Sequence, residues 1–188
     1  MRRFLKRLAD CFFTWKFPEP SLLELVPVGV IVTQAWSKLR DGQPGPGNTL
    51  LADTAIDLSW KRGFKVIAQE EVAYVYPGRF AFVARAPKSC TDGRSTPEWN
   101  TYMVAVKQAE ICLQYGWQTV LVVAAPVHMG RALWVYERLG FRALPAPVHN
   151  ARAYNHPDTV HWSTRGSLLW TYIRELMCRL LFLWQGKI

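Results

Sequence analysis

Several features that would assign a chemistry at once are scarce or absent in this sequence. Its four cysteines stand far apart, and no CxxC pair or Cys/His pair has the spacing of zinc ligands. His149, His156 and His161 form only a loose group in a polar segment, whereas ligand sets are usually spaced more closely. We therefore expect small buried thiols and no metal site.

Glycine-rich nucleotide motifs and a secretory signal are also missing. The segment DGQPGPGN at positions 41–48 contains neither GxGxxG nor GK[ST], so turn chemistry accounts for its glycines. Near the start of the chain Asp10 interrupts the apolar residues, which leaves no clean signal-peptide core. The sequence therefore predicts neither a dinucleotide fingerprint nor a P-loop, and we expect a cytoplasmic protein.

Positive charge dominates, with a formal net charge of +9. Five basic residues lie within the first sixteen positions, among apolar residues at three- and four-residue spacing. This pattern predicts a basic amphipathic helix within residues 1–20, ended by Pro18 and Pro20. Two interpretations stay open, because such a helix can lie on a bilayer surface or pack on its own domain.

The other end of the chain, residues 166–188, predicts an apolar helix. Between positions 168 and 184 only Arg174, Glu175 and Arg179 are charged. A helix this apolar requires burial on nearly all sides, and charges near its middle disfavour a membrane span. We expect this helix to pack beside the N-terminal helix, on the domain or at a membrane surface.

Between the two ends, residues 21–165 alternate apolar runs with helical patterns. Runs at positions 26–34, 65–69 and 120–125 predict strands, and positions 74–84 predict one or two more around a turn at Pro77 and Gly78. Helices are expected over 50–62, 97–115 and 130–139. The strand runs lack polar alternation, which is typical of parallel strands buried on both faces. The sequence therefore predicts a three-layer α/β sandwich around a mainly parallel sheet.

The strongest strand pattern ends in a proline, a histidine and an arginine, in VLVVAAPVHMGRA at positions 120–132. Ligands of open parallel sheets bind outside the carboxyl ends of the strands, beside helix N-termini that attract anions. His128 and Arg131 would share one helix face there, and a guanidinium can bind an oxyanion through two hydrogen bonds. The pattern indicates an anion site. A structural role stays open, with the histidine capped by backbone and the arginine paired with a surface carboxylate.

A second group of polar residues lies in RSTPEWN at positions 94–100. Ser95 and Glu98 have the spacing of a capping box, and Pro97 suits the first turn of a helix. Glu98 would also lie at the sheet edge, where a carboxylate can act as an acid, a base or a substrate ligand. On chemistry alone we favour the cap, and the functional interpretation stays open.

The segment at positions 116–147, GWQTVLVVAAPVHMGRALWVYERLGFRALPAP, resembles the SanA, YdcF and ElyC family of bacterial proteins. The resemblance rests on His128, Met129, Arg131 and Ala132 between two strand patterns. Upstream, Thr96 and Glu98 resemble a Thr-x-Glu-Asn element of the family. The resemblance implies a Rossmann-like domain over residues 21–165, and the final helix resembles the C-terminal tail of the family.

The resemblance also implies a function. It suggests a protein peripheral to the inner (plasma) membrane that binds an anionic, phosphate-bearing small molecule or lipid-linked phosphate in cell-envelope or peptidoglycan-related metabolism. An enzyme of this kind would be a transferase or hydrolase acting on a phosphate-bearing or S-adenosylmethionine-type substrate. Arg131, Thr96 and Asn100 would bind the substrate, and His128 and Glu98 would be catalytic. No cofactor is assigned.

The alternative is a non-catalytic membrane-surface binding or scaffold protein with a degenerate pocket. Relatives tend to carry glycines after the first two strands, whereas VIVTQAWSK and VIAQEEVAY have none, so side chains would obstruct a phosphate there. Trp99 and Trp170 also replace residues expected from the family pattern. Nucleic acid is not an expected partner, because the basic residues concentrate in a terminal helix and not along a groove.

Overall fold

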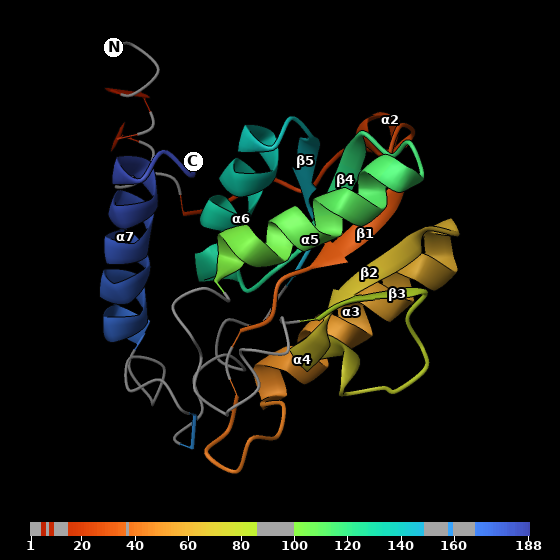
Figure 1. Ribbon diagram of the computed structural model, residues 1–188, viewed down its shortest axis with the longest axis horizontal. Coiled ribbons are helices and arrows are strands. Elements are labelled where there is room, and N and C mark those ends of the chain that lie inside the picture. Colours follow the sequence, from red (N-terminus) through yellow and green to blue (C-terminus); the bar gives the residue numbers. More distant parts are fainter. Residues whose placement is uncertain are drawn as a thin grey trace.

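The strands form one parallel sheet. The computed structural model describes residues 5–6, 8–9, 15–36, 38–85, 100–148, 158–159 and 168–188. Its five strands are β1 (Val30–Thr33), β2 (Lys65–Gln69), β3 (Phe82–Ala84), β4 (Thr119–Val123) and β5 (Arg142–Pro145). They lie in the order β3-β2-β1-β4-β5, and every neighbouring pair is parallel (Figure 1). This order is that of a doubly wound, Rossmann-like sheet.

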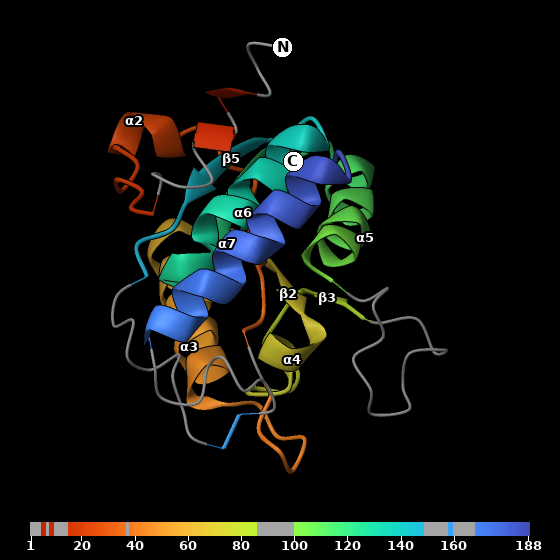
Figure 2. The same ribbon diagram turned by 90° about the vertical axis from the view of Figure 1, so that its left-hand side faces the viewer.

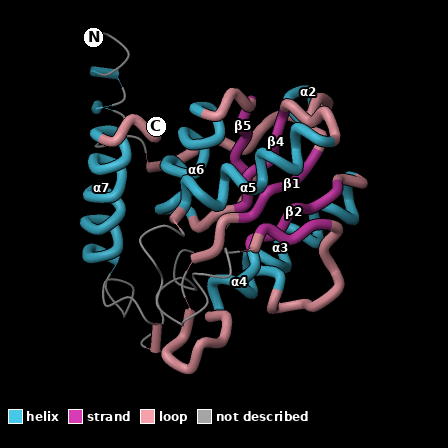
Figure 3. The backbone as a smooth tube through the Cα atoms, viewed as in Figure 1, coloured by secondary structure: helices cyan, strands magenta, loops and turns pink. Residues whose placement is uncertain are grey.

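Helices cover both faces of the sheet and complete the predicted three layers. One face carries α3 (Pro46–Arg62) and α4 (Glu70–Ala73), and the other carries α5 (Thr101–Gln114) and α6 (Pro126–Arg138) (Figure 3). The short helix α2 (Leu22–Leu25) precedes β1 and starts with a capping box between Ser21 and Glu24. A last helix, α7 (Leu168–Trp184), lies outside the three layers and packs on α6 (Figure 2).

The two central strands explain why the sequence shows no polar alternation. Every residue of β1 and β4 is buried. Val30 and Val32 point into the core beneath α5 and α6, whereas Ile31 points into the core beneath α3. Because both faces of a central strand are covered by helices, apolar residues are favoured at every position.

Several elements differ from the sequence-based expectation. Of the one or two strands expected within positions 74–84, one is present, β3, and it starts only at Phe82 because a turn with Gly78 at a φ of 77° occupies the residues before it. Helix α3 starts at Pro46, before the expected position 50. The residues directly after β2 form α4, which the sequence did not predict. Helix α6 starts at Pro126, four residues before the expected position, because proline has no N–H to lose in a first turn.

The chain near the N-terminus contacts the C-terminal helix. The Trp15 ring lies 4.9 Å from the Tyr172 ring in an edge-on arrangement, and Leu8 packs against Trp134 and Leu183. Most of the expected N-terminal helix lies outside the described residues, so its packing beside α7 stays a prediction. In the described ranges, no helix combines the length and the apolar character that a membrane crossing requires.

Candidate functional site

His128 and Arg131 lie in the first two turns of α6, directly after the carboxyl end of β4. Because α6 starts at Pro126, both residues are helical and lie three positions apart, on the side that faces α7. Their exposed fractions are only 3% and 9%. The structure therefore brings the predicted pair together, but inside the protein.

Arg131 binds a carboxylate that comes from α7. Its Nε donates to Oε1 of Glu175 at 3.0 Å, and its second terminal nitrogen donates to Oε2 at 2.9 Å. The first terminal nitrogen donates to Oγ1 of Thr101, the first residue of α5, at 2.7 Å. This two-bond geometry is the one that a guanidinium uses for a bound oxyanion. In this structure Arg131 is paired with Glu175 and is not open to an external ligand.

His128 lies between Thr101 and Glu175, and its Nδ1 faces Glu175 beyond the distance of a close hydrogen bond. Its Nε2 is 3.4 Å from Oγ1 of Thr101, and its Nδ1 is 3.5 Å from Oε2 of Glu175. Nδ1 is buried and makes no hydrogen bond to the described residues. Burial, helped by the positive charge of Arg131, lowers the pKa of His128 to about 4. The imidazole is therefore neutral near pH 7.

A second arginine meets the same carboxylate. Arg179, one turn after Glu175 on α7, is fully buried, and its Nε is 3.5 Å from Oε1 of Glu175. Its guanidinium lies 3.9 Å from the centre of the Trp15 ring and donates to the carbonyl of Val127. Burial is the largest single influence and would raise the pKa of Glu175, but the charge and hydrogen bonds of Arg131, together with the nearby His128, outweigh it and hold this pKa well below its usual range. Glu175 is therefore ionised.

Backbone N–H groups at the ends of β1 and β2, which a phosphate would need as donors, already donate to side chains. The N–H of Ala35 donates to Oε1 of Gln69 at 2.7 Å, and the N–H of Trp36 donates to Oδ1 of Asn48 at 2.8 Å. The N–H of Gln69 donates to Oγ1 of Thr33 at 3.0 Å. Side chains of the chain itself therefore satisfy the backbone N–H groups at these two strand ends.

A buried polar network fills the space between the sheet and α5 and α6. Nε2 of Gln34 donates to Oε1 of Gln108 at 3.1 Å and to the hydroxyl of Tyr136 at 3.0 Å, and Tyr136 also hydrogen-bonds to Gln108. Nε2 of Gln108 donates to the carbonyls of Thr33 and Ile67 at 2.9 and 3.1 Å. These hydrogen bonds join the end of β1 and strand β2 to α5 and α6, so the network holds strands and helices together.

The remaining predicted site residues have different outcomes. Thr96 and Glu98 lie outside the described residues, as do Trp99 and the three histidines between positions 149 and 161. Oδ1 of Asn100 accepts from the N–H groups of Tyr102 and Met103 at 3.0 and 3.3 Å, which makes Asn100 the N-cap of α5. The prediction that this helix begins at Pro97 is therefore wrong for α5, whose first residue is Thr101.

Sequence reasoning missed Glu175 and Thr101 as partners of the pair. A signal for Glu175 was present, because a carboxylate and two arginines within an otherwise apolar helix require buried partners. Nothing in the local sequence pairs that helix with Arg131, which lies 44 positions earlier. Thr101 has no distinguishing pattern at all.

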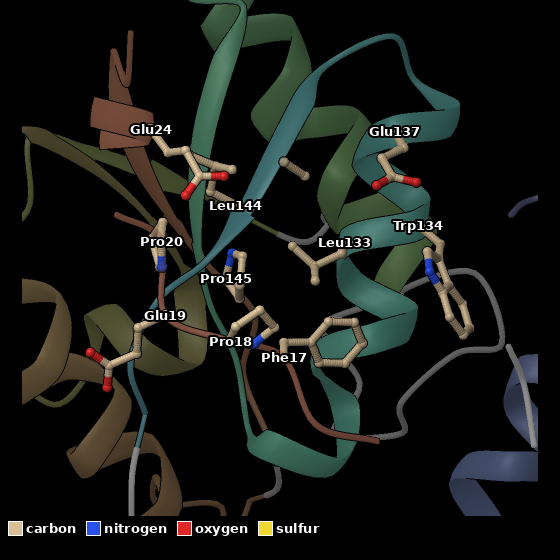
Figure 4. A pocket seen from close by; sticks show the side chains of 11 residues that line it. Phe17, Pro18, Glu19, Pro20, Glu24, Leu133, Trp134, Glu137, Leu144 and Pro145 are labelled. Carbon is tan, nitrogen blue, oxygen red and sulfur yellow. The ribbon is translucent and has the colours of Figure 1, made fainter. Parts of the chain in front are cut away.

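A cavity of about 220 Å³ lies on another side of α6 (Figure 4). Phe17, Pro18 and Pro145 stand close to Leu133 there. Its lining also includes the following carboxylates: Glu19, Glu24 and Glu137. Neither His128 nor Arg131 lines this cavity, and its acidic groups make it unsuitable for an anion.

The arrangement around Arg131 can therefore bind an oxyanion, and an oxyanion of the chain itself occupies it. Among the described residues, no group of three or more histidine, cysteine, aspartate and glutamate side chains is placed to hold a metal ion. Comparison with known proteins does not assign a role to this geometry: no family model, curated protein or solved structure matches the chain.

Proposed function

We propose that the protein binds the surface of an anionic lipid bilayer through the outward face of α7, and that its Rossmann-like domain serves as a binding or scaffold module. The proposal rests on one observation above all, the distribution of polar and apolar residues on α7. Its charged residues Glu175 and Arg179 are buried on the inward face, beside Phe182 and Leu183, whereas its outward face is apolar.

The two faces of α7 differ in burial. The inward residues Thr171, Glu175 and Arg179 follow one another at single-turn spacing, and each is at least 97% buried. The outward face consists of the following residues, all exposed: Leu169, Trp170, Ile173, Met177, Leu181 and Trp184. A helix on a protein surface in water normally has the opposite arrangement. A contiguous apolar stripe on such a helix marks an interaction surface.

Charge and aromatic residues favour lipid as the occupant of this stripe. The net charge of +9 attracts an anionic membrane surface and repels a second copy of the same chain. Trp170 and Trp184, at the two ends of the stripe, are 49% and 82% exposed, and tryptophan is enriched at membrane–water interfaces. A helix lying in the interface plane would bury the apolar stripe.

The internal pairing of the candidate site favours a module that does not catalyse a reaction in this conformation. Substrate binding by Arg131 would compete with the two hydrogen bonds to Glu175. The transferase or hydrolase activity, the role in envelope metabolism and the inner-membrane location that the family resemblance implies stay predictions.

Sedimentation with lipid vesicles tests the proposal. Met177→Glu places a charge in the stripe and should weaken binding to phosphatidylserine-containing vesicles by about tenfold or more, because apolar burial is lost. Leu113→Glu is the matched control, since Leu113 is an exposed leucine on α5, away from α7. Equal binding of both variants would contradict the proposal. Dissociation of a dimer by Met177→Glu would instead identify a second copy as the occupant.

A further inference from the structure

We infer that Arg131, His128 and Thr101 form a phosphate-binding site that Glu175 occupies as an internal substitute, and that this site accepts a phosphate group when α7 moves away from α6. This inference goes beyond lipid attachment, because it concerns the inward face of α7 and a ligand that needs no membrane.

The carboxylate of Glu175 lies where a bound oxyanion would lie. Nitrogens of Arg131 and Arg179 face its Oε1 at 3.0 and 3.5 Å, and nitrogens of Arg131 and His128 face its Oε2 at 2.9 and 3.5 Å. Arginine binds carboxylate and phosphate with the same planar pair of donors. The contacts that Arg131 and His128 make to Glu175 are therefore contacts that a phosphate can use.

One donor of the site, Nδ1 of His128, faces Glu175 without a close hydrogen bond. Oγ1 of Thr101 accepts a hydrogen bond from Arg131, so its own proton is available to Nε2 of His128. We assign the imidazole proton to Nδ1 on that ground, which places an N–H donor toward Glu175. Nδ1 is nevertheless buried without a hydrogen bond. A planar carboxylate has only two oxygens to share among these donors, whereas a tetrahedral phosphate has a third.

The attachment of α7 makes its displacement feasible. Its inward face carries three polar residues that regain hydration when the helix leaves α6. The apolar contact between the helices lies in the last turns of α7, where Leu183 packs on Trp134 and Phe182 enters the core cluster that includes α6. Release would remove Glu175 and Arg179 together and leave Arg131, His128 and Thr101 on α5 and α6. A ligand that binds only the released state shifts the population toward that state.

The ligand class is a phosphate monoester group, either on a soluble molecule or on a lipid headgroup. Calorimetric titration of the full chain with inorganic phosphate tests the site without lipid. Glu175→Gln keeps the side-chain shape and removes the competing charge, so its affinity for phosphate should exceed that of the wild type by about tenfold or more. Glu110→Gln, which removes an exposed carboxylate paired with Lys107 at 3.0 Å, is the control and should change nothing.

The gain must depend on Arg131. Glu175→Gln combined with Arg131→Lys should return phosphate affinity to the wild-type level, since lysine lacks the planar pair of donors. A folded Glu175→Gln protein that binds phosphate no better than the wild type would overturn the inference, and so would a gain that survives Arg131→Lys. Circular dichroism verifies folding of each variant.

Leu183→Ala keeps the inference testable if Glu175→Gln does not fold. This substitution reduces the apolar contact of α7 with Trp134 and changes no charged residue. Phosphate should then increase amide hydrogen exchange across α7, and no change in exchange would count against the site.

Vesicles containing phosphatidic acid distinguish the two sources of the phosphate group. If a lipid headgroup is the ligand, inorganic phosphate will compete with binding of Glu175→Gln to these vesicles but not to phosphatidylserine vesicles. If inorganic phosphate competes with binding to neither kind of vesicle, the ligand is a soluble phosphate compound. Because the phosphate titration contains no lipid, its failure and the failure of vesicle attachment are separate results.

Discussion

At position 131 an arginine donates three hydrogen bonds, two to Glu175 and one to Thr101. In the sequence the same arginine is an anion-binding candidate, because it follows a buried strand and a histidine at helical spacing. Both descriptions concern the same chemistry, since a guanidinium binds a carboxylate of its own chain as it binds a foreign oxyanion. The residue type predicted the interaction, and the fold supplied the partner.

Burial of His128 should make stability depend on pH. Its pKa is lowered from 6.5 to about 4, so between these values the unfolded chain binds more protons than the folded protein. The free energy of unfolding should therefore decrease by about 3 kcal/mol as the pH falls through this window. Glu175, whose pKa is also lowered, adds a loss of stability at still lower pH.

Urea unfolding of the wild type and of His128→Gln at about pH 7 and about pH 4.5 measures this dependence. The variant should have the shallower decrease in stability, because glutamine does not titrate. The histidines at positions 149, 156 and 161 are present in both proteins and cancel in the comparison. Parallel decreases in the two proteins would show that His128 is not the titrating group.

At the scale of elements, α6 and α7 approach closely at Gly130. A Cβ atom at this position would lie 2.8 Å from a terminal nitrogen of Arg179 and 3.0 Å from Cζ of Phe17. Arg179 is held in place, since it is fully buried and hydrogen-bonds to the carbonyl of Val127. Glycine therefore permits the contact between the two helices.

Gly130→Ala should loosen α7 without unfolding α6. Alanine favours a helix by about 1 kcal/mol over glycine, so α6 itself is not weakened, while the added methyl group displaces Arg179. Hydrogen exchange should accelerate across α7 and stay unchanged in the sheet. Gln114→Ala, at an exposed position of α5, is the control. Unchanged exchange in α7 would mean that Arg179 and Phe17 adjust without cost.

Most elements follow from local patterns. The strand predicted at positions 65–69 coincides with β2, and the run at 120–125 contains most of β4. The start of α6 was missed because an apolar strand and the first turn of a helix look alike in sequence. The short helix α4 was missed because four residues provide too little periodicity to detect.

At the scale of the whole molecule, the net charge of +9 and the apolar stripe of α7 should act on lipid in different ways. Electrostatic attraction is screened over about 10 Å at 0.1 M salt, whereas apolar burial is not weakened by salt. Binding to phosphatidylserine-containing vesicles should therefore fall as salt rises and approach the weaker binding to pure phosphatidylcholine.

Sedimentation across a series of sodium chloride concentrations measures this effect. A residual binding that is lost in Met177→Glu would identify the stripe as its source. Binding that does not change with salt would contradict a contribution from the net charge.

The sequence by itself determined the three-layer α/β sandwich, its parallel central strands and the position of the His128–Arg131 pair at the end of a strand. These features depend on residue types and short spacings, which act between neighbours in the chain. Only the tertiary structure decided that Glu175 binds Arg131 and that α7 buries its charged residues Glu175 and Arg179 while its apolar stripe stays exposed. Such partners lie 44 positions apart, and which distant helix covers a strand end depends on the packing of the whole chain.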